Sequence, residues 1–133
     1  MVVTVKEFTI GSLPEVRHLM LMSDLHLGSA FTDEDAIVED LKTARRYNAR
    51  ILLNGDVFDA IVPSDKKRYN PTAIHPRLRN RADVLNAAVD FASDLLKPYA
   101  DLIDVIGVGN HETASEKYHA ADPVSMLIRD FKG

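Results

Sequence analysis

The stretch LMLMSDLHLGS, residues 19–29, decides how this chain folds. Its first four residues are apolar, which is typical of a central strand buried on both faces of a sheet, so we expect a strand over 16–23. The apolar run stops at Ser23, and two polar residues follow one position apart, Asp24 and His26. Taken alone, this pair is either the polar turn after a buried strand or a pair of metal ligands.

Two more apolar runs end in polar residues in the same way. The sequences ARILLNGD, residues 49–56, and LIDVIGVGNHE, residues 102–112, each predict a short strand that leads into a glycine-containing turn. A segment rich in β-branched residues at 2–10 predicts a short edge strand. Between 60 and 80, three prolines and the lack of a sustained period predict a long loop.

Helices are expected between and after these strands. Apolar residues recur at helical spacing over 33–48, with Thr32 as the predicted N-cap, and over 80–97, with Asn80 as the predicted N-cap. A last helix is expected over 122–130. This alternation of strands and helices favours an α/β fold with a largely parallel sheet and flanking helices. In such a sheet the loops after the strands meet at one edge, where ligands bind.

Composition limits the class of protein. With 133 residues, 46% hydrophobic and 27% charged, the chain is expected to form one globular domain over 1–133. It has no cysteine, so a bound metal would need oxygen and imidazole ligands. The N-terminus lacks the pattern of a secretory signal, and no apolar run approaches the roughly 20 residues that span a bilayer. We therefore expect a cytoplasmic protein with no membrane partner.

The three polar strand ends are ordinary turn chemistry when each is taken alone. Together, DLH at 24–26, GDVFD at 55–59 and GNHE at 109–112 resemble the first three motifs of the calcineurin-like metallophosphoesterase superfamily, D-x-H, G-D-x-x-D and G-N-H-D/E. The resemblance covers residues 16 to about 113. It implies that the chain is the first half of a four-layer α/β/β/α sandwich.

The resemblance also implies two divalent metal ions. Residues i and i+2 of a strand point to the same side, so Asp24 and His26 can bind one ion. A carboxylate such as Asp56 can bridge two ions roughly 3.5 to 4 Å apart. By the resemblance, Asp24 and His26 bind the first metal, Asp56 bridges both, and Asn110 binds the second. Mn²⁺ is expected first, with Fe, Zn²⁺ and Mg²⁺ as alternatives.

Two further residues receive catalytic roles from the resemblance. His111 is implied to lie near the leaving-group oxygen, as a proton donor or electrostatic stabiliser, and Asp59 to orient it. For Asp59 the alternative is a solvated loop carboxylate. Glu112 is interpreted as a helix-capping residue and left outside the site.

The later motifs of the superfamily have no counterpart after Glu112. The family continues with further histidine motifs, whereas His119 lacks their context and is either a substitute ligand or a surface residue. We expect a domain truncated at its C-terminus that by itself binds metal weakly and has low or absent turnover. A second polypeptide or a dimer partner that donates His75 or His119 could complete the site.

The substrate is expected to be a phosphodiester. The arginine that follows the second aspartate in the superfamily's protein phosphatases is replaced here by Ala60 and Ile61. The motifs SDLHLG and GDVFD look more like those of the branch that contains DNA-repair nucleases and related phosphodiesterases. We therefore expect hydrolysis of DNA, RNA or a nucleotide. The alternatives are a phosphomonoesterase or protein phosphatase, and a non-catalytic binding domain.

A basic segment between residues 60 and 81 adds a hint about the substrate. It holds six basic residues against the single acid Asp65. Arg77, Arg79 and Arg81 either contact the phosphates of a polyanion or belong to a solvated loop that offsets the acidic metal edge.

Overall fold

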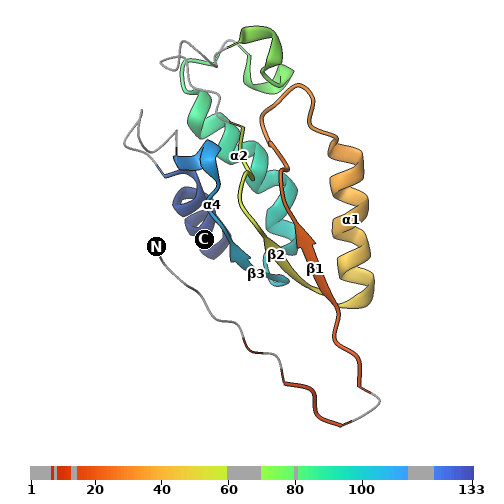
Figure 1. The fold of residues 1–133 in the computed structure, drawn as a ribbon. Coiled ribbons are helices and arrows are strands. Elements are labelled where there is room, and N and C mark those ends of the chain that lie inside the picture. Colours follow the sequence, from red (N-terminus) through yellow and green to blue (C-terminus); the bar gives the residue numbers. More distant parts are fainter. Residues whose placement is uncertain (1–6, 8, 13–14, 60–69, 80, 114–121) are drawn as a thin grey trace.

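In the computed structural model of this molecule, three parallel strands form the sheet of the described residues. The structure describes residues 7, 9–12, 15–59, 70–79, 81–113 and 122–133. The strands β1 (Leu19–Met22), β2 (Arg50–Leu53) and β3 (Ile103–Ile106) pair in parallel in the order β1-β2-β3. Figure 1 shows this sheet with its flanking helices, so the predicted α/β class with a parallel sheet is confirmed.

The helices connect the strands in the predicted order. α1 (Glu34–Tyr47) leads from β1 to β2, and α2 (Val84–Leu96) leads from β2 to β3. Both connections move one strand along the sheet in the same direction, and right-handed crossovers of this kind place their helices on one face. Figure 1 shows α2 running behind the strands. The last helix, α4 (Pro123–Lys132), lies beside α2, where the Ser93 hydroxyl donates to Asp130.

One face of the sheet is buried and the other is open. Ile51 and Leu53 of β2 point into the core and are 0% and 1% exposed. Leu19 and Leu21 of β1 point to the opposite face and are 51% and 75% exposed. The prediction that 16–23 is a central strand buried on both faces is therefore wrong. The physical reason is that β1 lies at the edge of the sheet and the crossover helices cover only one face.

The start of α1 differs from the prediction by one residue. Asp33, not Thr32, is the N-cap, and its Oδ1 accepts a hydrogen bond from the Ala36 amide at 3.0 Å. The Thr32 hydroxyl instead donates to the His26 carbonyl at 2.6 Å. Thr32 therefore ties the loop after β1 to the start of α1.

Helix α2 begins later than predicted, and α4 begins as predicted. The N-cap of α2 is Asp83, whose Oδ1 accepts from the Asn86 amide at 3.3 Å, so the expected helix is wrong over 81–83. The predicted cap, Asn80, lies outside the described residues. Asp122 caps α4 and accepts from the Ser125 amide at 3.1 Å.

The remaining predictions concern segments that the structure describes only in part. Residues 7, 9 and 10 are in no strand, so the expected edge strand is wrong there, and the rest of it lies outside the described residues. The expected loop contains two short 3-10 helices, η1 (Pro71–Ala73) and η2 (Pro76–Leu78). Among the described residues, none of the helices combines the length and the apolar character needed to cross a membrane.

Candidate functional site

The polar loops after the strands meet at one edge of the sheet, as the parallel order predicts. The loop after β1 runs alongside the loop after β2, because the His26 amide donates to the Asp56 carbonyl at 3.1 Å and the Leu27 amide to the Val57 carbonyl at 2.8 Å. The loop after β3 joins them through the His111 amide, which donates to Asp56 Oδ1 at 3.1 Å. Residues from all three motifs therefore contact one another.

Three of the predicted metal ligands have a left-handed backbone. The φ angles of Asp24, His26 and Asp56 are 58°, 46° and 49°. The one other non-glycine residue of this kind in the described part of the chain is Asn48, the C-cap of α1. A left-handed conformation costs a non-glycine residue on the order of 1 kcal/mol or more. The convergence of Asp24 and His26 therefore comes from this turn beyond the end of β1, and the prediction that strand alternation produces it is wrong.

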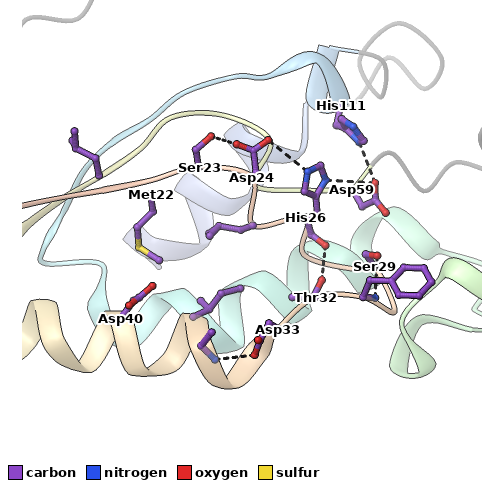
Figure 2. Close-up of a pocket in the computed structure, with 15 residues that line it drawn as sticks. Met22, Ser23, Asp24, His26, Ser29, Thr32, Asp33, Asp40, Asp59 and His111 are labelled. Atoms are coloured by element: carbon purple, nitrogen blue, oxygen red, sulfur yellow. Dashed lines mark hydrogen bonds and ion pairs between the residues drawn. The ribbon is translucent and has the colours of Figure 1, made fainter.

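Asp59 lies between two histidine rings. Its Oδ1 is 3.1 Å from His111 Nδ1 and 3.8 Å from His26 Nδ1, and the two rings lie edge to face with centroids 4.8 Å apart. Asp24 Oδ1 lies 3.7 Å from His26 Nε2 on the other side of that ring. Figure 2 shows the row from Asp24 through His26 to Asp59 and His111. His26, Asp59 and His111 each offer one ligand atom, all within 4.8 Å of one another, and could hold a metal ion.

Asp56 and Asn110 form a second pair of potential ligands. The Asn110 amide faces the Asp56 carboxylate, and with its nitrogen turned inward it donates to both carboxylate oxygens at 2.9 Å. With its oxygen turned inward, three oxygen atoms meet at one place, which is the donor set that hard divalent cations prefer. The chemistry of this pair therefore fits a divalent cation.

Two glycines allow the loops after β2 and β3 to approach this closely. A Cβ on Gly109 would lie 2.5 Å from the Asp56 nitrogen, and a Cβ on Gly55 would lie 2.9 Å from the Gly109 nitrogen. Gly55 also has a φ of +81°, which favours glycine. Gly55 and Gly109 are therefore needed for the close contact between the two loops as well as for the turns.

Glu112 caps a helix, as the sequence reasoning interpreted it, because its Oε2 accepts from the amide of Gly109, directly before the helical turn 110–113. Its side chain is 1% exposed, and it accepts hydrogen bonds from the backbone amides of Asp56 at 3.1 Å, Phe58 at 2.8 Å and Gly109 at 2.8 Å. The sequence reasoning missed the other two contacts, with the amides of Asp56 and Phe58, and the only available signal was the acidic fourth position of GNHE.

A cleft of about 650 Å³ opens over the histidine row. Four carboxylates and two imidazoles line it, together with two exposed apolar side chains. The acidic residues are Asp24, Asp33, Asp40 and Asp59; the apolar residues are Leu21 and Phe31. The lining of the cleft therefore combines acidic with apolar side chains; Asp24, Asp33 and Asp40 are exposed, whereas Met22 and Ile37 are buried.

The structure does not bring the predicted substrate-binding arginines to this cleft. Arg77 Nη2 donates to Asp94 Oδ2 at 2.9 Å, and Arg79 donates to two backbone carbonyls of its own loop at 3.0 and 3.2 Å. Arg77, Arg79 and Arg81 are all absent from the lining of the cleft. The lysines and the arginine at 66–68 lie outside the described residues.

The other two histidines named in the sequence also lie apart from the row. His75 Nε2 is 2.7 Å from Glu34 Oε1, and its ring packs on Phe91 with centroids 4.7 Å apart. His75 thereby fastens the 70–79 segment to α1 and α2. His119 lies outside the described residues.

The site as a whole is a set of carboxylates, imidazoles and one amide that three loops hold in contact. Such donors can bind hard or borderline divalent cations and can transfer protons. No family model, no curated protein and no solved structure matches this chain.

Proposed function

We propose that this chain is a metallophosphoesterase domain that hydrolyses phosphodiester bonds with two divalent metal ions. The observation that carries the proposal is the left-handed backbone of Asp24, His26 and Asp56, which are three of the four residues that the motif resemblance assigns to metal binding. Strained conformations persist where the surroundings over-determine them, and they gather at functional sites. Aspartate and histidine tolerate this backbone better than most residues, but glycine adopts it at lower cost. At all three positions the chain instead carries a side chain that can bind a metal.

The charge of the cleft supports a role for cations. Four aspartates line it, so a phosphoester, which is itself an anion, would meet strong repulsion there. Bound divalent ions reverse the local sign of the charge. An acidic cleft is therefore suited to a phosphoester only when metal ions occupy it.

The proposed ligands are those that the motif resemblance implies. Asp24 and His26 line the cleft, whereas Asp56 and Asn110 are absent from its lining. The cluster of His26, Asp59 and His111 shares only His26 with this set. Asp24 and His26 would hold the first ion, Asp56 would be shared by both ions, and Asn110 would hold the second. The chemistry that such ions would supply is neutralisation of the phosphoryl oxygens and a water nucleophile. Mn²⁺ is the proposed ion, with Fe, Zn²⁺ and Mg²⁺ as the other metals that this donor set fits.

His111 and Asp59 supply the proton chemistry. Asp59 Oδ1 lies within hydrogen-bonding distance of His111 Nδ1, at 3.1 Å. A carboxylate in this place fixes the ring orientation and stabilises the imidazolium. His111 Nε2 can then donate a proton to the leaving-group oxygen.

The open face of the sheet supports the finer fold proposal. Leu19 and Leu21 expose apolar surface beside the cleft, on the face that the crossover helices leave uncovered. In the four-layer sandwich implied by the resemblance, a second sheet packs on this face. We assign to that layer the histidine ligands that the later motifs of the superfamily supply.

Phe31 favours a substrate with an aromatic group. Its side chain is 84% exposed although it lines the cleft. A nucleobase stacked on an aromatic side chain gains about 1 to 3 kcal/mol. The substrate class proposed is therefore a nucleotide or nucleic-acid phosphodiester. A phosphomonoester is the second candidate, because the metal ligands would serve either.

A chromogenic assay tests the activity. With Mn²⁺ present, we expect the protein to hydrolyse bis-p-nitrophenyl phosphate faster than p-nitrophenyl phosphate, and Asp56→Asn to abolish both activities because the shared ligand is lost. Asp94→Asn, which changes an exposed carboxylate on α2, is the matched control and should retain activity. Equal rates for Asp56→Asn and the unaltered protein would contradict the proposal, and faster monoester hydrolysis would favour the second candidate.

A further inference from the structure

We infer that Glu112 is a positioning residue that assembles the loops of the metal site before any metal binds. It lies next to His111 in the chain, yet its carboxylate turns into the protein and is 1% exposed. Its two oxygens accept three backbone hydrogen bonds, from Asp56, Phe58 and Gly109. The expected effect of Glu112 on metal affinity rests on the proposed function, whereas its role in joining the loops rests on the geometry alone.

The three donors show what Glu112 joins. Asp56 and Phe58 belong to the loop after β2, and Gly109 belongs to the loop after β3. Glu112 Oε2 accepts from one amide of each loop, so a single oxygen atom links the two. A buried carboxylate is tolerated only when donors pair with it, and here the donors are the backbone of the site itself.

A second contact runs in the opposite direction. Asp56 Oδ1 accepts from the His111 amide at 3.1 Å while the Asp56 amide donates to Glu112 at 3.1 Å. Asp56 and Glu112 thus each accept a hydrogen bond from the backbone of the segment that carries the other. This pair of hydrogen bonds holds Asp56 at its φ of 49° and keeps its carboxylate beside Asn110.

The chemistry of the three donors requires an acceptor with two oxygens. Glutamine has nearly the shape of glutamate but replaces one oxygen with an NH₂ group, which cannot accept. In Glu112→Gln at least one backbone amide would face another donor, so the loops would be held less firmly. Partners of this kind behind a metal ligand typically change metal affinity about 10- to 100-fold.

The test compares metal affinity with stability. Isothermal titration with Mn²⁺ is expected to show affinity at least tenfold weaker for Glu112→Gln than for the unaltered protein, measured well below the unfolding temperature of both. Ser93→Ala, which alters another buried polar residue away from the cleft, is the control for a general loss of stability and should leave the affinity unchanged. A folded Glu112→Gln with unchanged affinity would overturn the inference while leaving the proposed function intact.

Amide exchange in the unaltered protein gives a second readout that needs neither the variant nor the metal. The amides of Asp56, Phe58 and Gly109 lie in loops, and we expect them to exchange slowly in metal-free protein because Glu112 binds them. Exchange of all three amides at the rate of unprotected loop amides would overturn the inference. This test remains valid if Glu112→Gln does not fold. Failure of the unaltered protein to bind Mn²⁺ would instead contradict the proposed function.

Discussion

His111 is the residue at which two interpretations of the site differ. The proposed mechanism makes it a proton donor oriented by Asp59, whereas its distance from His26 and Asp59 would also allow all three to share one metal ion. The Nδ1 atom that faces Asp59 decides between them: in the first interpretation it donates to a carboxylate, and in the second it is a ligand. A substitution separates these roles.

We expect His111→Ala to retain metal binding and to lose catalytic rate by about 10² to 10⁴-fold, because general acid catalysis contributes on that order. Metal content after dialysis, together with kcat for bis-p-nitrophenyl phosphate, checks both parts. His26→Ala is the contrasting variant and should lose metal. Loss of metal from His111→Ala would assign the histidine row to a metal ion instead.

At the scale of elements, the sequence locates the strands and helices but misplaces some of their ends. Thr32 and Asp33 are both good N-caps, and the choice depends on the hydrogen bond that Thr32 makes with His26. Likewise, the apolar run at 19–22 indicates burial without indicating that β1 is an edge strand. The first error arises from a contact six residues away along the chain, and the second from the order of strands that lie far apart in the sequence.

The N-cap of α4 provides a prediction at this scale. Burial raises the pKa of Asp122, but hydrogen bonds from the Ser125 hydroxyl and from the amides of Ser125 and Val124 outweigh it, so the pKa lies below its ordinary value. A lowered pKa means that Asp122 stabilises the fold above the pKa of the unfolded chain. That stabilisation is lost as the pH falls through the lower pKa of the folded state.

Asp122→Ala is therefore expected to reduce the free energy of unfolding at pH 7 by about 1 kcal/mol, a typical value for a lost N-cap. Urea unfolding between pH 7 and pH 2.5 measures the difference between variant and unaltered protein. The difference should shrink as the pH falls, because Asp122 becomes protonated in the folded state. A difference that stays constant over this range would show that the carboxylate charge does not contribute.

At the scale of the whole molecule, the sheet has one protected face and one open face. The sequence predicts the parallel order, and from it the meeting of the three motifs at one edge. It does not predict the left-handed backbone at Asp24, His26 and Asp56, nor the burial of Glu112, because residues about 30 to 55 positions apart determine them. The sequence also does not predict the exposed contact between Arg77 and Asp94, which lie 17 positions apart.

The two faces of the sheet should respond differently to substitution. Leu21→Lys is expected to change the free energy of unfolding by less than about 0.5 kcal/mol, since Leu21 is 75% exposed. Leu53→Ala, on the protected face and 1% exposed, should cost about 2 to 5 kcal/mol. Chemical denaturation of the isolated chain measures both. A large cost for Leu21→Lys would mean that the face is already covered.

The central claim is that Asp56 bridges two divalent ions, and electron paramagnetic resonance of Mn²⁺ titrated into the protein tests it most directly. The account predicts saturation at two Mn²⁺ per chain with the signal of an exchange-coupled pair. Asp56→Asn should abolish the coupling, while Asp94→Asn should preserve it. Only uncoupled Mn²⁺, or a coupled signal that survives Asp56→Asn, would contradict the account.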